Sequence, residues 1–107
     1  MYARHSLCIL ALAQLFASAS WAADGAAVYR ESCAKCHGDT GKSDTSVGKA
    51  LNIPPLAGDA SLVKLSEAEV MERIKAASKH PPTTKALSDD DLKAVATFAL
   101  GLASSAN

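Results

Sequence analysis

The chain has 107 residues, and its eleven basic residues balance its eleven acidic residues to give a formal net charge of zero. This length allows at most one domain. The balanced charge excludes a general nucleic-acid binder, which needs a strongly basic face.

The first 22 residues predict a signal peptide that is removed on export. Arg4 precedes the apolar run LCILALAQLFASAS, which is too short to span a bilayer, and Ser20 and Ala22 are small residues of the kind that a signal peptidase requires. A retained membrane anchor is the alternative. We therefore expect a periplasmic protein without stable membrane insertion after cleavage, and a single domain over residues 23–107.

After this segment the chain is poor in large side chains. It carries ten basic and eleven acidic residues, with one Phe, one Tyr and no Trp. Domains of this size with few large side chains in the core often need an additional stabilising element. We therefore expect a bound group to fill the centre of the fold.

The first helix is predicted just after the signal peptide. Asp24 can cap a helix over residues 25–36, and Gly38 and Gly41 end it. The stretch from residue 39 to residue 58 contains Gly, Ser, Thr, Asn and Pro without periodicity. This composition predicts a loop or a disordered segment.

The motif CAKCH, at the end of this predicted helix, contains Cys33, Cys36 and His37. A redox disulfide of the thioredoxin kind would need a preceding strand, and no strand pattern occurs. A zinc site would need four ligands, for which His80 is the remaining candidate. The motif is most typical of covalent haem attachment, in which two thiols bind the haem vinyl groups and the histidine binds the iron.

Two further helices are predicted in the second half of the chain. Ser66 and Glu69 form a capping-box pattern before the first of them, and Ser88 and Asp91 repeat this pattern before the second. Three acids in the first turn of the last helix suit its positive end. Apolar residues follow at helical spacing in both segments, so the predicted fold class is all-α.

These segments resemble class I c-type cytochromes, the small bacterial proteins with one haem. DGAAVYRESCAKCHGDTGKS is similar to the opening of that family, NIPPLAGDASLV to its proline segment and LSDDDLKAVATFALGL to its last helix. The resemblance covers nearly all of residues 24–103. It implies a cytochrome c fold, with three to five short helices around one haem c attached through Cys33 and Cys36, and with His37 on the iron.

The resemblance implies two further contacts. Gly25 and Tyr29 on the first helix match the residues that cross the last helix, where Phe98 is the aromatic partner. The second ring nitrogen of His37 is expected to donate to a carbonyl of the Pro54–Pro55 segment. The alternative is that these prolines only shape the loop.

The histidine in the stretch KHPP stands where most members of this family have a methionine before a proline. His80 lies eight residues before Ser88, and Pro81 holds it away from helical geometry. We expect His80 to be the second axial ligand of the iron. The alternatives are Met71, which lies on the apolar stripe of a helix, and an open site. Two imidazoles predict a low-spin, low-potential haem.

These features together predict a periplasmic electron-transfer protein rather than an enzyme. We expect a monomer that meets other redox proteins in transient contacts. By resemblance, it could connect an inner-membrane quinone enzyme to an outer-membrane multihaem conduit in extracellular iron or metal metabolism. Five lysines are expected around the haem edge and could steer acidic partners: Lys42, Lys49, Lys75, Lys79 and Lys85.

Two other functions remain open at this point. A haem enzyme or a sensor of gas or peroxide would let His80 detach from the iron, with Lys79, Thr83 and Thr84 near the vacated position. A small cytochrome subunit of a larger oxidoreductase would use the same haem within a stable complex.

Overall fold

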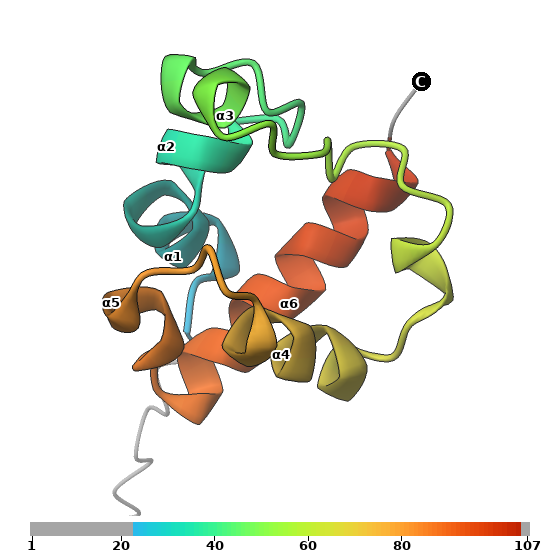
Figure 1. The fold of residues 1–107 in the computed structure, drawn as a ribbon. Coiled ribbons are helices and arrows are strands. Elements are labelled where there is room, and N and C mark those ends of the chain that lie inside the picture. The colour runs from blue at the N-terminus through green and yellow to red at the C-terminus, as the bar shows by residue number, and fades with distance from the viewer. Residues whose placement is uncertain (1–22, 106–107) are drawn as a thin grey trace, which may run out of the picture.

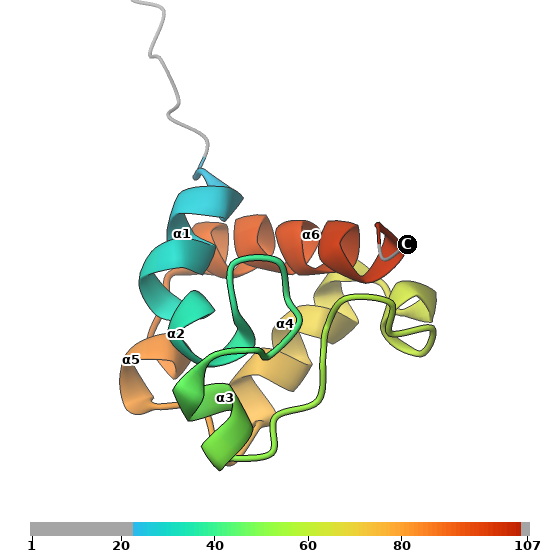
Figure 2. The ribbon, with the colours of Figure 1, turned by 90° about the horizontal axis from the view of Figure 1, so that it is seen from above.

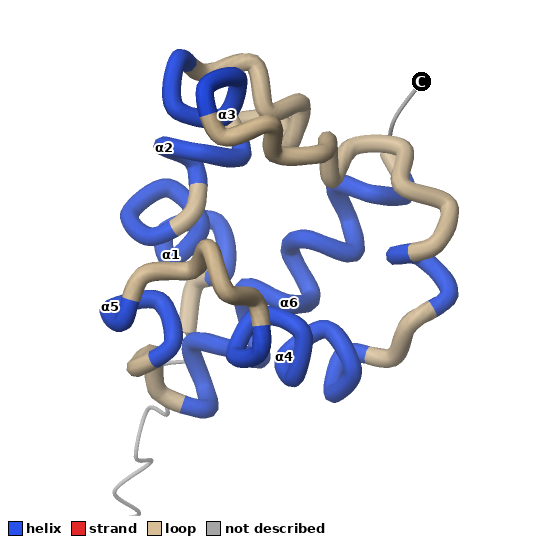
Figure 3. Tube along the Cα trace, viewed as in Figure 1, coloured by secondary structure: helices blue, strands red, loops and turns tan. Residues whose placement is uncertain are grey.

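The computed structural model of the chain describes residues 23–105, so the expected signal peptide lies outside the described residues. Within this range the fold is entirely helical, as Figures 1 and 3 show. The elements are α1 (Gly25–Ser32), α2 (Ala34–His37), α3 (Ser46–Ala50), the 3-10 turn η1 (Leu62–Lys64), α4 (Glu67–Ala76), α5 (Pro82–Lys85) and α6 (Asp89–Ser104). The predicted all-α class is confirmed. None of the helices in residues 23–105 has the length and apolar character of a membrane span.

The described residues contain more helices than the three to five that were expected. The predicted first helix is divided at Cys33, whose φ of −128° separates α1 from α2. The segment expected as a loop contains α3, where the Thr45 hydroxyl accepts a hydrogen bond from the Gly48 amide at 2.9 Å. The short α5 follows the histidine stretch, with Pro82 at its first position, where a missing N–H costs nothing.

The three longer helices begin where the capping residues predict. The Asp24 carboxylate accepts hydrogen bonds from the first turn of α1. Ser66 and Glu69 form a complete capping box at α4, and the Ser88 hydroxyl accepts from the Asp91 amide at α6. These polar contacts fix the ends of the elements that surround the centre of the molecule.

α1 crosses α6 closely, and Figure 2 shows the two helices side by side. A Cβ atom added at Gly25 would meet the backbone of Ala94, with the carbonyl carbon at 2.9 Å. The rings of Tyr29 and Phe98 pack at a centroid distance of 4.9 Å. The expected crossing of a glycine and two aromatic residues is therefore present.

Most of the buried apolar side chains fall into two clusters rather than one. The first contains Leu62, Val70, Ala96 and Ala103, and the second contains Tyr29, Ala34 and Val95. Two partly buried residues, Leu56 and Ile74, pack against both clusters. Since most of these side chains are small, the centre between the clusters is thinly filled.

Candidate functional site

Two histidines face each other at the centre of the fold. His37 ends α2, and His80 lies in the loop between α4 and α5. In Figure 1, α2 lies above α5. Their ring centroids are 6.1 Å apart, and the ring planes are inclined by 75°. Metal–imidazole bonds are about 2.0–2.1 Å long, so two rings on opposite sides of one ion have centroids about 6 Å apart. The observed spacing therefore suits one shared metal ion.

The backbone of the CAKCH motif turns sharply after His37. Gly38 has a φ of 79°, in the left-handed region that favours glycine. Its carbonyl accepts a hydrogen bond of 2.6 Å from the buried Tyr29 hydroxyl. The turn is thereby anchored to α1, which fixes the position of the histidine.

His80 is oriented by a backbone carbonyl. Its Nδ1 lies 2.7 Å from the carbonyl oxygen of Ile74 on α4. Because a carbonyl only accepts, Nδ1 carries the proton and Nε2 is the nitrogen with a free lone pair. This is the arrangement in which proteins commonly hold a metal-binding histidine.

His37 lacks the hydrogen bond that the resemblance implies. Its Nδ1 is buried without a partner among the described residues, while the Pro54 carbonyl accepts from the Ser43 hydroxyl at 3.1 Å. The expected bond to the Pro54–Pro55 segment is therefore absent from this structure. Burial, and then the neighbouring His80, lower the pKa of His37 below its ordinary value. Its neutral form, which binds metals, is therefore favoured.

The two cysteines of the motif are free thiols and are only partly buried. Burial, and then the charge of Cys36, raise the pKa of Cys33 to about 11. A redox-active CxxC pair has a lowered thiol pKa instead. Residues 23–105 also contain no group of three or more Cys, His, Asp or Glu side chains placed to hold a metal ion. The redox-disulfide and zinc alternatives therefore have no support in the described part of the chain.

Two adjoining cavities surround the facing histidines. Their volumes are about 630 and 370 Å³. Both are lined by Cys33, His37, Pro54, Ala77, His80 and Thr84. The larger cavity also contacts Cys36, whereas the smaller one extends to Leu62 and Val95 of the two apolar clusters. The cysteines, the histidines and the thin core therefore border two adjoining cavities that share their lining residues.

The alternative ligand Met71 lies away from this space. It packs against the first apolar cluster and lines neither cavity. Its role among the described residues is the filling of the core.

The lysines differ in how they lie relative to the two cavities. Of the five that were expected at the haem edge, Lys79 alone lines a cavity, and Lys35 borders the same cavity. The Lys79 ammonium donates a hydrogen bond of 2.8 Å to the Leu51 carbonyl. Lys75 is paired with carboxylates of Glu72 and Asp89 at 3.8 and 3.9 Å. The steering of acidic partners by these lysines stays a prediction.

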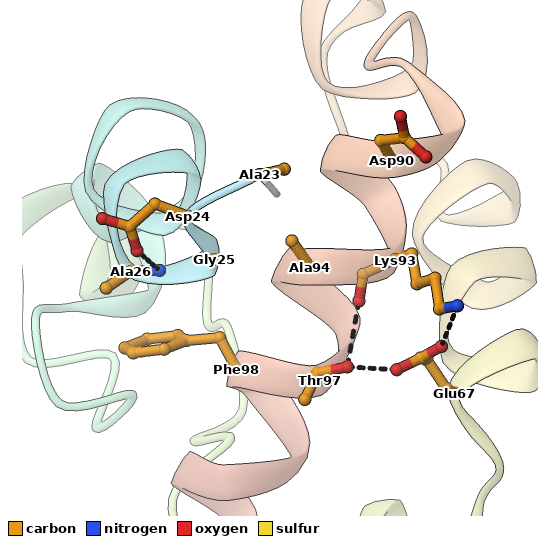
Figure 4. Close-up of a pocket in the computed structure, with 10 residues that line it drawn as sticks. All are labelled: Ala23, Asp24, Gly25, Ala26, Glu67, Asp90, Lys93, Ala94, Thr97 and Phe98. Carbon is orange, nitrogen blue, oxygen red and sulfur yellow. Dashed lines mark hydrogen bonds and ion pairs between the residues drawn. The ribbon is translucent and has the colours of Figure 1, made fainter. Parts of the chain in front are cut away.

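A further groove, of about 650 Å³, lies between the start of α1, the start of α4 and α6. Figure 4 shows that Glu67 faces both Thr97 and Lys93 there. The Lys93 ammonium lies 4.0 Å from the carboxylate. Because no cysteine or histidine lines this groove, it offers no ligand for a haem iron.

Some residues of the site could not be recognised in the sequence. The Ile74 carbonyl that orients His80 is a backbone group, so no residue type signals it. Thr84 is 3% exposed and lines both cavities, although its type and position in the chain suggest a surface loop. Both contacts depend on the path of the backbone between α4 and α5.

Comparison with known proteins agrees with this geometry. Residues 21–98 match the family model described as cytochrome C oxidase, cbb3-type, subunit III. The chain is 32% identical over 92 residues to the cbb3-type cytochrome c oxidase subunit CcoP of Azospirillum brasilense. The match covers 84% of this chain and 31% of that protein, so the chain spans about a third of the relative's length. No solved structure matches.

The residues of the site fit the haem c that this family implies. Two free thiols lie at the attachment spacing, two imidazoles face each other at 6.1 Å, and a cavity continues between the apolar clusters. These residues would together hold a covalently attached haem, and such a haem supplies one-electron chemistry. The chain is therefore an electron-transfer cytochrome with haem c attached through Cys33 and Cys36, and it belongs to the family of cbb3-type cytochrome c oxidase subunit III.

Proposed function

We propose that this cytochrome is an exported, low-potential electron carrier whose haem iron is held between His37 and His80. The observation that carries this proposal is the pair of facing imidazoles, in which the Nε2 of His80 is left free by the bond to the Ile74 carbonyl. Imidazole is a stronger donor than a methionine thioether and stabilises oxidised iron. The chain thus favours a lower potential than methionine-ligated relatives have.

The surroundings of His80 support a carrier rather than an enzyme. The Ile74 carbonyl holds its ring, and the backbone that follows is constrained by Pro81 and Pro82. A histidine that is restrained both at its ring and in its backbone would not easily leave the iron, so an exogenous molecule would not easily bind there. Electrons would then pass through the haem edge at the larger cavity, where Lys35 and Lys79 could steer acidic redox partners.

The cellular setting is part of the same proposal. Export to the periplasm rests on the signal-peptide pattern of residues 1–22. Transfer from an inner-membrane quinone enzyme to an outer-membrane multihaem conduit would suit a low potential. This route rests only on the resemblance to bis-histidine cytochromes and on the histidine that replaces the family's usual methionine.

Substitution of His80 tests the ligand assignment. The oxidised protein should show the low-spin electron paramagnetic resonance of two imidazoles and no far-red methionine-to-iron band. His80→Met should create that band and raise the reduction potential, because a thioether replaces a stronger donor. His80→Ala should open the site and allow rapid binding of carbon monoxide by the reduced protein.

Met71→Leu is the matched control, since it removes the one methionine sulfur of residues 23–105 at similar volume. It should leave the spectrum unchanged and alter the free energy of unfolding by less than about 1.5 kcal/mol. If Met71→Leu instead abolishes a far-red band, and His80→Ala changes nothing, the iron is not held by His80. Prompt binding of carbon monoxide by the unmodified protein would contradict a closed site.

A second candidate is a cytochrome subunit of a stable oxidoreductase complex, which the match to an oxidase subunit favours. Native electrophoresis of cell fractions, stained for covalent haem, separates the two functions. A subunit should migrate with a large membrane complex, whereas a carrier should migrate as a small protein in the periplasmic fraction.

A further inference from the structure

We propose that Thr45 and Gly48, at the start of α3, are positioning residues that hold His37 in place at the haem iron and so help to set the reduction potential. This role rests on the proposed function only in placing His37 on the iron. It gives a part in electron transfer to a segment whose sequence predicts a loop.

His37 needs such support because its own ring is not anchored. Its Nδ1 is buried without a hydrogen-bond partner among the described residues. A metal-binding histidine is usually oriented by a hydrogen bond at its second ring nitrogen. The position of the His37 imidazole therefore depends on the backbone that carries it, which is the end of α2.

The end of α2 is held by two hydrogen bonds from the segment that leads into α3. The Thr45 hydroxyl donates to the Cys36 carbonyl at 3.2 Å, and the Ser43 amide donates to the His37 carbonyl at 2.8 Å. The same Thr45 hydroxyl accepts from the Gly48 amide at 2.9 Å. Because a hydroxyl can donate and accept at once, Thr45 joins the cap of α3 to the haem-attachment motif.

Gly48 allows α3 to approach the motif closely. α3 packs against α2, and the two helices are neighbours in Figure 1. A Cβ atom added at the buried Gly48 would lie 2.8 Å from the Ser43 carbonyl oxygen and closer still to the Cys36 carbonyl oxygen. Both obstacles are backbone atoms, which cannot turn away as the end of a long side chain can. A methyl group there would therefore displace Cys36 and, with it, the adjacent His37.

A displaced histidine changes the electronic state of the iron. An axial imidazole in its best position donates most strongly, and strong donation stabilises the oxidised state. A displaced imidazole donates less, so the reduction potential rises. The angle between the two ring planes, which is 75° here, also determines the positions of the low-spin resonance lines. A residue that merely supports the fold would change neither property.

Gly48→Ala in the holoprotein is the first test, and Gly101→Ala is its matched control, since a Cβ atom added at Gly101 meets nothing within 4 Å. Electron paramagnetic resonance and potentiometry are the measurements. Gly48→Ala should move the low-spin lines and raise the potential. The expected rise corresponds to a roughly threefold to tenfold change in the equilibrium constant of reduction, where tenfold is 59 mV for a one-electron couple. Gly101→Ala should change neither property.

Variants of Thr45 separate the contact with Cys36 from the cap of α3. Thr45→Val removes the hydroxyl and should raise the potential, whereas Thr45→Ser keeps a hydroxyl and should match the unmodified protein. Thr45→Asp keeps an acceptor for the Gly48 amide, but an ionised carboxylate has no hydrogen to donate to the Cys36 carbonyl. It should therefore move the low-spin lines. Ser46→Asp adds the same charge at an exposed neighbour and should leave these lines unchanged.

The proposal is wrong if Gly48→Ala and Thr45→Val leave both the low-spin lines and the potential as Gly101→Ala and Thr45→Ser do. If Gly48→Ala yields no holoprotein, the comparison of Thr45→Val with Thr45→Ser decides. Failure of the proposed function is seen elsewhere, in an unmodified protein whose resonance is not that of two imidazoles. The potential of the Thr45 variants still reports the position of His37 in that case, whichever group binds the iron opposite it.

Discussion

At the scale of single residues, the two histidines differ in the support that the backbone gives them. His80 donates from Nδ1 to the Ile74 carbonyl, whereas the buried Nδ1 of His37 has no partner among the described residues. A hydrogen bond at the second nitrogen raises the basicity of a metal-binding imidazole. The proposed distal ligand is therefore the better oriented of the two, which is the reverse of what the resemblance implies.

Gly25 is a single residue on which the α1–α6 crossing depends. Gly25→Ala should lower the free energy of unfolding by about 1–3 kcal/mol, because the new methyl group meets the backbone of Ala94 rather than a movable side chain. Denaturant unfolding of the holoprotein measures this change.

Gly101→Ala is the matched control on α6. A Cβ added there meets nothing within 4 Å, and the residue lies inside the helix. This variant should be more stable by about 0.5–1 kcal/mol, because alanine loses less conformational entropy than glycine in a helix. Equal effects of the two substitutions would show that the crossing is not tightly packed.

At the scale of the elements, the sequence allows prediction of the helices that have their own capping residues and apolar stripes. α1, α4 and α6 begin after Asp24, Ser66 and Ser88, as expected. α3 and α5 have only five and four residues, too few to display helical periodicity. The break at Cys33 likewise follows from a backbone dihedral that residue types do not reveal.

The same limit applies to the site. His80 could be proposed from the prolines after it and from its distance to the last helix, which are properties of the sequence. The Ile74 carbonyl could not, because it is a backbone group whose direction depends on the turn after α4. The lining by Asp59 and Arg73 could not, because it depends on how α4 approaches the loop before η1.

The capping box of α4 should make the stability of this helix depend on pH. The Ser66 amide donates to the Glu69 carboxylate at 2.8 Å, and this bond lowers the pKa of Glu69 below its ordinary value of 4.5. A carboxyl whose pKa is lower in the folded state stabilises the fold at higher pH. This contribution is lost as the pH falls below 4.5 through the folded pKa.

Glu69→Gln removes the charge but keeps an acceptor at the same position. The stability advantage of the unmodified protein over this variant should therefore shrink as the pH is lowered from 6 to 3, in thermal unfolding of the holoprotein. Glu72→Gln, on the same helix but without a capping bond in the described residues, is the control. A difference that stays constant over this range would show that the capping bond does not depend on the charge of Glu69.

At the scale of the whole molecule, the haem is expected to hold two small apolar clusters together. Leu56 and Ile74 are the partly buried residues that pack against both clusters, and both also line the smaller cavity. Without the cofactor, these clusters would have few contacts with each other. Protein domains of this size are only marginally stable.

The haem-free chain should therefore be largely disordered. The double variant Cys33→Ala, Cys36→Ala removes both attachment points, and its far-ultraviolet circular dichroism should show much less helix than the holoprotein has. Amide hydrogen exchange should be fast throughout residues 23–105. A protected, native-like haem-free chain would contradict a core that depends on the cofactor.

The bond between His80 and the Ile74 carbonyl also bears on the speed of electron transfer. It joins the proposed ligand to α4, while Lys79, the preceding residue, is joined to the Leu51 carbonyl on another segment. If His80 binds the iron as proposed, a ligand restrained in this way would keep one geometry in both oxidation states. The nuclear rearrangement that accompanies each electron would then be small, so the reorganisation energy would be low and a weak driving force would be enough for rapid exchange with a partner.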